Sequence, residues 1–452
     1  MLFTTSLFFI FILLFNSCSK KIKSQKPNFI IIIVDDAAWN DSGTYGNSLI
    51  KTPNIDRLAN EGLTFNNAFL TTSSCSPSRC SIITGRFPHN TGAEELHMPL
   101  PSNQLIFPGE LQKAGYYTVS AGKWHLGPKR AEFDTIYDGA PSGCEFWEEA
   151  LNNRPQEKPF FMWFAALDPH RDYQPNTINE PHKPDEVFVP PFLPDNDSTR
   201  KDLALYYDEI SRMDSYIGKV LKILKEQNVD RNTLIIYMSD NGRPFPRSKT
   251  RLYDSGIKTP FILRWPSNIK SRLRTDALIS SVDIAPTICE LAGVSLPKTF
   301  QGVSFVSVLD DNQKDVRDYV AAEHNWHDYQ THERAIRNKQ FLYIRNSFPE
   351  FNASPPADAV RSITYQEMIK VFNKGGLVEE FSDCFISSRE PEELYDVVND
   401  PYQMNNLALD KNFQDDLSKM RQILDKWIQE TNDSIPINPS PDQFDRWSGE
   451  RL

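Results

Sequence analysis

Residues 29–36 read FIIIIVDD, and this stretch decides the fold. An apolar run without polar alternation is typical of a strand that is buried on both faces of a parallel sheet. The strand ends in Asp35 and Asp36, and open α/β sheets place their binding sites at the carboxyl ends of their strands. The stretch therefore predicts a central strand with a functional site at its end.

Further apolar runs at 160–167 and 233–239 have the same character, and helical stretches separate the runs. We expect helices at 53–61, 108–114 and 201–225. Alternating strands and helices predict an α/β fold, with helices on both faces of a doubly wound or mixed sheet. Polar and proline-rich segments at 174–200 and 347–360 indicate excursions over the surface.

The sequence pattern changes after about residue 335. Short strand-like pieces at 340–345 and 393–398 precede one amphipathic helix at 413–430. We therefore expect a catalytic domain at 28–335 and a smaller C-terminal α+β subdomain at 336–452.

The composition is that of a globular protein, with 452 residues, 39% hydrophobic and 24% charged. The net charge of -11 argues against nucleic-acid binding, which needs a basic surface. An anionic substrate therefore needs a local basic pocket. The six cysteines form no CxxC pair, which argues against a zinc site and a dense disulfide framework. One or two disulfides remain open among Cys80, Cys144, Cys289 and Cys384.

Residues 2–15 form an apolar run that is too short to span a bilayer comfortably. The small residues at its end are typical of a secretory signal, expected at 1–17. LFNSC at 14–18 resembles a bacterial lipobox, in which Cys18 is acylated and becomes the mature N-terminus. No basic residue precedes the run and Phe15 stands where Leu is commonest, so a plain cleaved signal is the alternative. We expect an exported protein, lipid-anchored to a bacterial membrane (outer membrane or periplasmic face), or secreted if Cys18 is not lipidated.

The strongest chemical signal is CSPSR at 75–79, followed by TGR at 84–86. These motifs resemble the maturation signature of type I sulfatases, in which a formylglycine-generating or sulfatase-maturing enzyme oxidises the cysteine, here Cys75, to Cα-formylglycine. The hydrated aldehyde suits sulfate chemistry, because one hydroxyl attacks sulfur and the other, once deprotonated, expels sulfate. The resemblance implies an alkaline-phosphatase-like large mixed sheet between helices. Taken alone, the pentapeptide also fits a loop cysteine beside a helix start.

The ends of two strands offer four oxygen ligands: Asp35, Asp36, Asp240 and Asn241. Hard oxygen ligands without histidine suit Ca²⁺ or Mg²⁺ rather than Zn²⁺. The resemblance implies one Ca²⁺ at these positions, with the formylglycine at Cys75 as a further ligand. A divalent ion there neutralises sulfate oxygens and acidifies the attacking hydroxyl.

GKWHLG at 122–127 matches another sulfatase motif. In an extended segment Lys123 and His125 project from the same side, because they are two residues apart. The resemblance implies that Lys123 contacts sulfate and that His125 acts as a base near the formylglycine hydroxyls. It also implies that Arg79 binds the oxygens of formylglycine and sulfate.

DPHR at 168–171 follows an apolar run, and His170 matches the histidine that protonates the leaving group in the family. Lys249 matches a second cation that holds sulfate. YDSG at 253–256 stands where the family has Tyr-Glu-Gly-Gly, so the surroundings of Lys249 depart from the family pattern.

Several motifs resemble the N-sulfoglucosamine sulfohydrolase (sulfamidase) branch, among them DPHR at 168–171 and SDNGRPFP at 239–246. The branch does not fix the substrate, because loops form the rim of the pocket. We expect a sulfated polysaccharide or its oligosaccharides, either algal such as ulvan or a heparan-type glycosaminoglycan. Candidate residues of the substrate-binding rim are His97, Arg243, His324, His327 and Arg334.

Other functions remain open. A sulfamidase specific for N-sulfoglucosamine and a formylglycine-dependent phosphonate or phosphate monoester hydrolase both fit this scaffold. A sugar-binding surface lipoprotein on an inactive scaffold is less consistent with the sequence, since every expected catalytic position is filled. A two-zinc alkaline phosphatase lacks its histidine ligands here. HNWH at 324–327 suits sugar stacking and hydrogen bonding, or is ordinary surface polarity.

Overall fold

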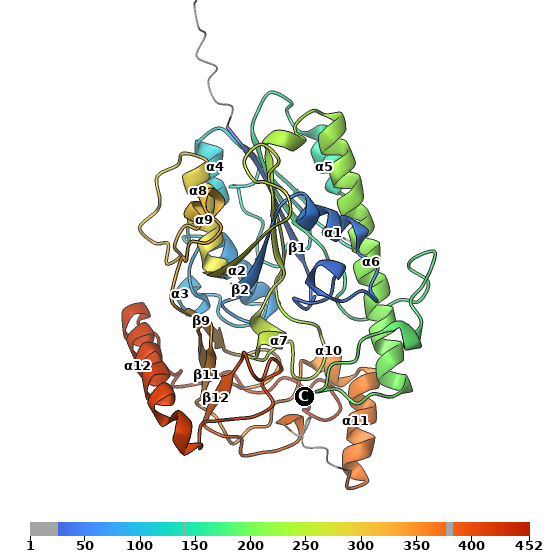
Figure 1. Ribbon diagram of the computed structural model, residues 1–452, viewed down its shortest axis with the longest axis vertical. Helices are drawn as coiled ribbons and strands as arrows, with labels where there is room; N and C mark the ends of the chain where they lie inside the picture. Colours follow the sequence, from blue (N-terminus) through green and yellow to red (C-terminus); the bar gives the residue numbers. More distant parts are fainter. Residues whose placement is uncertain (1–25, 140, 377–382) are drawn as a thin grey trace, which may run out of the picture.

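The computed structural model describes residues 26–139, 141–376 and 383–452. The expected signal segment at 1–17 and Cys18 lie outside these residues. A large sheet flanked by helices makes up most of the molecule, and a smaller sheet lies at one end of it (Figure 1). Of the helices in these ranges, none combines the length and the apolar character needed to cross a membrane.

The large sheet has eight strands in the order β4-β3-β5-β1-β6-β7-β2-β8. The strands are β1 (Asn28–Val34), β2 (Leu63–Phe69), β3 (Tyr117–Gly122), β4 (Thr135–Tyr137), β5 (Phe160–Ala165), β6 (Thr233–Ser239), β7 (Phe261–Arg264) and β8 (Leu273–Ser280). Strand β1 pairs in parallel with β5 and β6, whereas β7 runs antiparallel to β6 and β2. The predicted α/β fold with a large mixed sheet is therefore confirmed.

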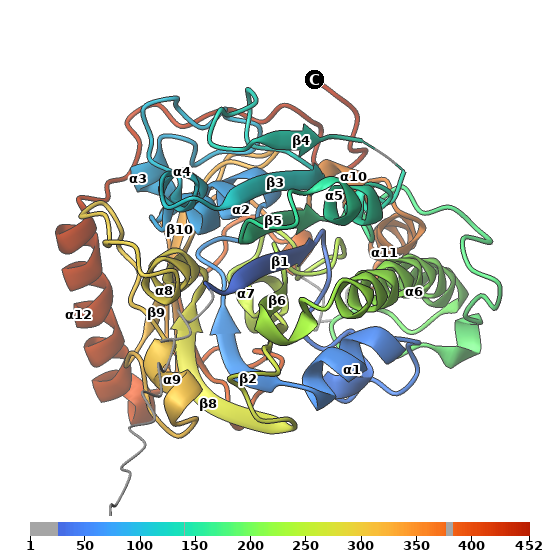
Figure 2. The same ribbon diagram turned by 90° about the horizontal axis from the view of Figure 1, so that it is seen from above.

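Helices cover both faces of this sheet (Figure 2). They are α1 (Pro53–Asn60), α2 (Cys75–Thr84), α3 (Pro88–Thr91), α4 (Phe107–Lys113), α5 (Trp147–Asn153), α6 (Asp197–Glu226), α7 (Asp254–Ile257), α8 (Ile284–Leu291) and α9 (Val306–Asp310). Alternate residues of β1 pack on opposite faces. Ile31 and Ile33 join the core with α2, α4 and α8, while Ile30 and Ile32 join the core with α1, α5 and α6. Burial on both faces explains why the strand has no polar alternation.

The long helix α6 begins four residues earlier than predicted. The side chain of Asn196 accepts a hydrogen bond from the backbone N–H of Thr199 at 2.9 Å and so caps the helix. The last residues of the expected surface excursion at 174–200 therefore belong to this helix. Short 3-10 helices complete the connections, at Gly43–Tyr45, Pro184–Glu186, Asp230–Asn232, Ser281–Asp283 and Lys411–Phe413.

The smaller sheet is antiparallel and has the order β12-β11-β10-β9. Its strands are β9 (Val320–His324), β10 (Glu333–Arg337), β11 (Phe341–Asn346) and β12 (Glu392–Asp396). Helix α12 (Gln414–Thr431) packs on it through Leu424 and Trp427. Strand β9 lies before residue 336, the expected start of the C-terminal subdomain, so the smaller sheet begins within the expected catalytic segment. The division into domains stays a prediction.

The segment 347–360 is not the surface excursion that its composition predicts. Its second half is largely buried and ends in the short helix α10 (Ala357–Val360), which is followed by α11 (Ile363–Asn373). Ala357 and Val360 pack against Tyr365 in a separate small core. The apolar partners come from elsewhere in the chain, so local composition does not reveal this burial.

The cysteines of the described residues are all free thiols: Cys75, Cys80, Cys144, Cys289 and Cys384. No disulfide therefore joins the four whose pairing the sequence leaves open. All five side chains are buried.

Candidate active site

Strands β1 and β6 end side by side, because Val34 pairs with Ser239 in their parallel register. The residues that follow are all buried: Asp35, Asp36, Asp240 and Asn241. Asp36 adopts a left-handed φ of 65°, and its backbone N–H donates to Asp240 Oδ1 at 3.2 Å. The amide of Asn241 donates to Asp36 Oδ1 at 2.6 Å. The structure thus brings together the four expected ligands from distant parts of the chain.

Helix α2 brings the signature cysteine to these strand ends, and all ten of its residues are buried. Cys75 Sγ lies 3.7 Å from Asp36 Oδ1. One turn later, Arg79 Nε donates to Asp240 Oδ2 at 2.7 Å, and a second guanidinium nitrogen lies 3.7 Å from Asp35 Oδ1. The i, i+4 spacing of Cys75 and Arg79 places both on one face of the helix.

The donor atoms at the strand ends fit a hard divalent cation. Asp35, Cys75 and Asp240 offer ligand atoms that lie within 4.8 Å of one another. Asp35 Oδ1 and Asn241 Oδ1 are buried and have no hydrogen-bond partner in the described part of the chain. A buried unpaired acceptor costs about 1–3 kcal/mol, and a cation between them removes that cost. Carboxylate and amide oxygens are the ligands that Ca²⁺ and Mg²⁺ prefer.

Three cations surround the carboxylates, of which Arg79 and Lys249 are buried and Lys123 is partly exposed. Lys123, just after β3, pairs with Asp35, and Lys249 Nζ lies 2.7 Å from Asp36 Oδ2. Arg79 is the third cation. Burial alone raises the pKa of Asp35, but Lys123, His170 and Arg79 more than offset it, so this pKa lies well below its usual range. The three cations balance the three carboxylates Asp35, Asp36 and Asp240, so a divalent cation bound there would make the cluster attractive to an anionic substrate.

The unmodified thiol of Cys75 is a poor nucleophile in this setting. Burial raises its pKa well above the ordinary value, although Lys123 and Lys249 oppose the shift. Because the thiolate is the reactive form of cysteine, the free thiol stays unreactive at neutral pH. The setting is consistent with a requirement for chemical modification at this position.

The segment with His125 is not extended, which corrects the sequence expectation. Strand β3 ends at Gly122, and His125 has a φ of 46°. Its Nε2 lies 2.9 Å from His97 Nδ1, and its Nδ1 is buried with no partner among the described residues. Burial, and next Lys123, lower the pKa of His125 to about 2, so its ring is neutral.

His170 lies in the loop after β5, where sequence reasoning placed it, and a carboxylate that the sequence did not indicate lies beside it. Its Nε2 is 4.0 Å from Asp36 Oδ2 and 3.8 Å from Asp358 Oδ2. Asp358, on α10, also lies 4.0 Å from Lys249 Nζ. Burial raises the pKa of Asp358, but Lys249 and His170 outweigh burial and hold it below the usual range. No local sequence signal marks Asp358, because only tertiary folding brings α10 to the site.

The expected rim residues lie in different places. His97 contacts His125, and His327 Nδ1 lies 2.7 Å from Ser74 Oγ, next to Cys75. Arg334 is held by Asp433, with its Nη2 at 2.9 Å from Asp433 Oδ1. His324 is buried, and Arg243 pairs with Asp41 at 2.6 Å. Geometry therefore places His97 and His327 beside the charge cluster, and the role of all five in substrate binding stays a prediction.

Comparisons with known proteins show which families and relatives the chain is similar to. A family model described as Sulfatase matches residues 27–147 and 144–294, and a second, described as N-sulphoglucosamine sulphohydrolase, C-terminal, matches residues 247–349. An ulvan-active sulfatase of Formosa agariphila is 30% identical over 94% of this chain and 78% of its own length. The N-sulphoglucosamine sulphohydrolase of Homo sapiens is 29% identical over 91% of each chain.

Solved structures share the fold. One, described in complex with its substrate D-glucosamine-2-N,6-O-disulfate, has a TM-score of 0.70 at 22% identity and covers 91% of this chain and 99% of its own. A 2-O GAG sulfatase has a TM-score of 0.70 at 22% identity and covers 92% and 96%. The Sulfatase model spans more than half of the chain. The chain therefore belongs to the sulfatase family and is a sulfuric ester hydrolase that resembles the sulfamidase branch.

Proposed function

We propose that this sulfatase removes sulfate groups from a sulfated polysaccharide or its oligosaccharides, using Cα-formylglycine at position 75 and one Ca²⁺. The observation that supports this most directly is the buried cluster in which three cations surround carboxylates next to Cys75. The printed names of the relatives, which include ulvan and N-sulphoglucosamine, support a carbohydrate substrate.

The metal and the modified residue have defined places in this proposal. Asp35, Asp36, Asp240 and Asn241 would hold Ca²⁺, which supplies positive charge near the oxygens of the sulfate group. A hydrated formylglycine at position 75 supplies the hydroxyl that attacks sulfur. The remaining functions belong to unmodified side chains of the chain.

Lys123 and Lys249 bind and orient the sulfate group, because both ammonium groups lie in the cluster that contains Cys75. Arg79 stays fully buried and holds Asp240 in place through its Nε. Buried charges of this kind act strongly on an anionic ligand, since little water screens them.

Two histidines move protons. We assign His125 as the base that serves position 75, since its Nδ1 has no hydrogen-bond partner in the described part of the chain. His170 Nε2 faces the cluster beside Asp358 and donates a proton to the leaving atom. That atom is oxygen in a sulfate ester and nitrogen in a sulfamate, so this arrangement serves either substrate.

A sulfamidase specific for N-sulfoglucosamine is the second candidate. It is favoured by the match of residues 247–349 to the C-terminal model of that enzyme. The ulvan-active relative is as similar to the chain as the human sulfamidase, at 30% and 29% identity. We therefore keep the polysaccharide sulfatase as the primary proposal and leave the O- or N-linkage to experiment.

We further propose that the protein is exported and anchored at a bacterial membrane by lipid on Cys18, and that a formylglycine-generating or sulfatase-maturing enzyme modifies Cys75. LFNSC at 14–18 and CSPSR at 75–79 support these two steps. Labelling of intact cells with a fatty-acid probe tests the anchor, with Cys18→Ala as its control. If the Cys18→Ala variant is labelled as well, the lipid is not attached at Cys18 and the proposed anchor is wrong.

The test of function is sulfate release from desalted ulvan, heparan and related oligosaccharides, with oxidation of Cys75 measured by mass spectrometry. Release from O-sulfated sugars supports the primary proposal, and release from N-sulfoglucosamine alone supports the sulfamidase. If the fully matured protein releases none, while an aryl phosphonate is hydrolysed, both are wrong and the phosphonate hydrolase takes their place.

A further inference from the structure

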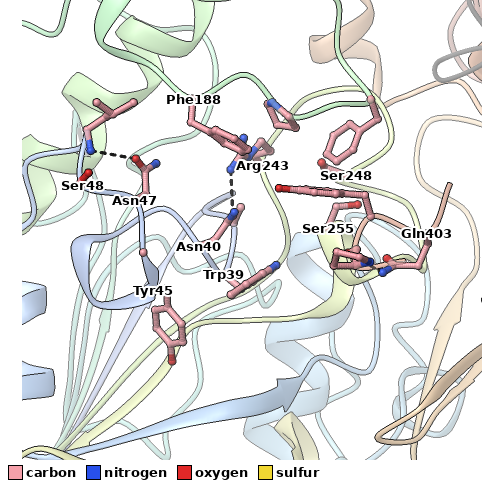
Figure 3. Close-up of a pocket in the computed structure, with 17 residues that line it drawn as sticks. Trp39, Asn40, Tyr45, Asn47, Ser48, Phe188, Arg243, Ser248, Ser255 and Gln403 are labelled. Atoms are coloured by element: carbon pink, nitrogen blue, oxygen red, sulfur yellow. Dashed lines mark hydrogen bonds between the residues drawn. The ribbon is translucent and has the colours of Figure 1, made fainter. Parts of the chain in front are cut away.

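A cavity outside the charge cluster is built from different side chains (Figure 3). It has a volume of about 420 Å³ and is bounded by four segments: 38–49, 188–192, 243–255 and 401–403. None of the six expected catalytic residues lines it. One loop joins the two regions, because Lys249 belongs to the cluster while Arg243 and Ser248 line the cavity.

Arg243 points to a ligand in this cavity. Its side chain is buried, with 2% of the residue exposed. Its Nη2 donates to Asp41 Oδ1 at 2.6 Å and to Asn40 Oδ1 at 3.2 Å. Its Nη1 has no hydrogen-bond partner in the ranges that the structure describes. A buried N–H without a partner is costly, and an oxygen of a bound molecule removes that cost.

Ser248 provides a second polar group without a hydrogen-bond partner. Its hydroxyl is buried and likewise lacks a partner among the described residues. Ser248 and Arg243 both line the cavity and belong to one loop. Together they offer one hydroxyl, able to donate and accept, and one N–H donor. The oxygens of a sugar ring and its hydroxyls can accept from such an N–H and exchange hydrogen bonds with such a hydroxyl.

Aromatic side chains form the apolar part of the wall. Trp39 and Tyr45 meet edge to face at 6.0 Å, and the ammonium of Lys258 lies 4.1 Å from the Trp39 ring centroid. Phe188, Phe192 and Tyr402 complete the aromatic lining, and 36% of Phe188 is exposed. Flat apolar rings next to a few polar groups are suited to the faces and hydroxyls of a sugar.

We infer that this cavity is a saccharide-binding site, separate from the site of sulfate cleavage, for a pyranose unit whose ring substituents pair with Arg243 and Ser248. The inference rests on the proposed polysaccharide substrate and adds a site to it. Arg243 is already neutralised by Asp41, so the ligand needs no sulfate group of its own. The cavity therefore holds a part of the polymer that is not being cleaved.

The test measures the binding of desulfated ulvan and desulfated heparan oligosaccharides to the Cys75→Ala protein by isothermal titration calorimetry. These probes lack the group that the charge cluster binds. Ser48 lies exposed at the wall of the cavity, so Ser48→Trp should fill the space and abolish binding. Ser215→Trp, at an exposed position on α6, is the matched control and should bind as the parent does.

Two milder variants keep the result interpretable if Ser48→Trp disturbs folding, which thermal unfolding reports. Phe188→Ala and Ser248→Ala should each weaken binding about 3- to 10-fold, since each removes one contact. The inference is wrong if no desulfated oligosaccharide binds the parent protein, or if binding is the same in all these variants. Because the probes carry no sulfate, this outcome is independent of the sulfate-release assay.

Discussion

The charge cluster around Cys75 and the cavity around Arg243 share one loop but differ in their content of charged and aromatic side chains. The cluster packs three carboxylates and three cations together with little exposure to solvent, and it leaves oxygen atoms of Asp35 and Asn241 unpaired. In the cavity a single cation is neutralised by Asp41, and aromatic rings form much of the wall. The first arrangement concentrates charge for chemistry, whereas the second offers shape and a few hydrogen bonds for recognition. One loop, residues 243–249, contributes to both.

The largest effect is expected from Cys75→Ala, which removes the proposed nucleophile from the cluster. Turnover should fall by more than about 10³-fold, because no other group can form the covalent intermediate. The fold should remain, since the substitution only shortens a side chain. Sulfate release and thermal unfolding measure the two quantities.

Cys80→Ala is the matched control, because Cys80 lies on the same buried helix but has no part in the proposed chemistry. Its sulfate release should stay within a few-fold of the parent. Full activity in Cys75→Ala would contradict the nucleophile assignment.

A smaller effect is expected from Asp240→Asn, which removes one charged ligand from the strand ends. Ca²⁺ affinity should fall about 10- to 100-fold, since carboxylate ligands provide most of the attraction for a hard cation. Metal content after dialysis, measured by mass spectrometry, reports this without any activity assay. Asp254→Asn is the control, because that carboxylate is also buried but pairs with Arg337 outside the cluster. Equal metal content in the two variants would remove Asp240 from the site.

Asp358→Asn tests whether the cluster extends to α10. We expect kcat/KM to fall about 10-fold, because the substitution removes the negative charge that attracts both His170 Nε2 and Lys249 Nζ. The thermal midpoint separates this effect from unfolding. An unchanged kcat/KM would show that Asp358 lies beside the cluster without serving it.

The smallest effect concerns His324, which belongs to neither region. Burial lowers its pKa from 6.5 to about 3, so the folded protein keeps it neutral while the unfolded chain protonates it below pH 6.5. Unfolding then takes up one proton at this residue. Its contribution to the free energy of unfolding falls by up to about 1.4 kcal/mol per pH unit from pH 6.5 toward pH 3.

His324→Asn should remove this part of the pH dependence. Urea unfolding of both proteins at pH 7, 6 and 5 measures the difference, which should shrink as the pH falls. If the free energy of unfolding changes equally with pH in both proteins, His324 is not held neutral in the folded state. A loss of sulfate release without loss of stability would return His324 to the rim of the substrate site.

Sequence reasoning reached the centre of the site because its signals are local. The apolar run of β1 ends in Asp35, and the motif that starts α2 contains Cys75, so a short window shows both strand end and chemistry. The parallel register of β1 and β6 then brings Asp240 to them. The same kind of apolar run also predicted the large sheet.

The features that the sequence did not predict depend on contacts between distant parts of the chain. Asp358 comes from a segment whose prolines and polar residues suggest a surface, and the packing of α10 against α11 brings it within 3.8 Å of His170 Nε2. His125 takes a left-handed backbone conformation, which is uncommon for a residue other than glycine and which the sequence did not indicate. Arg334 was expected at a sugar, but the chain supplies its partner, Asp433, 99 residues later.

The burial of α2 determines when Cys75 can be modified relative to folding. Cys75 is 2% exposed in a helix whose residues are all buried, so an enzyme that modifies it has no access once the chain has folded. Maturation as proposed has to occur on the nascent or unfolded chain, before the fold closes over the helix. A molecule that folds before this modification keeps the unmodified thiol of Cys75. The active fraction of a preparation is then fixed during synthesis, and later treatment of the folded protein cannot raise it.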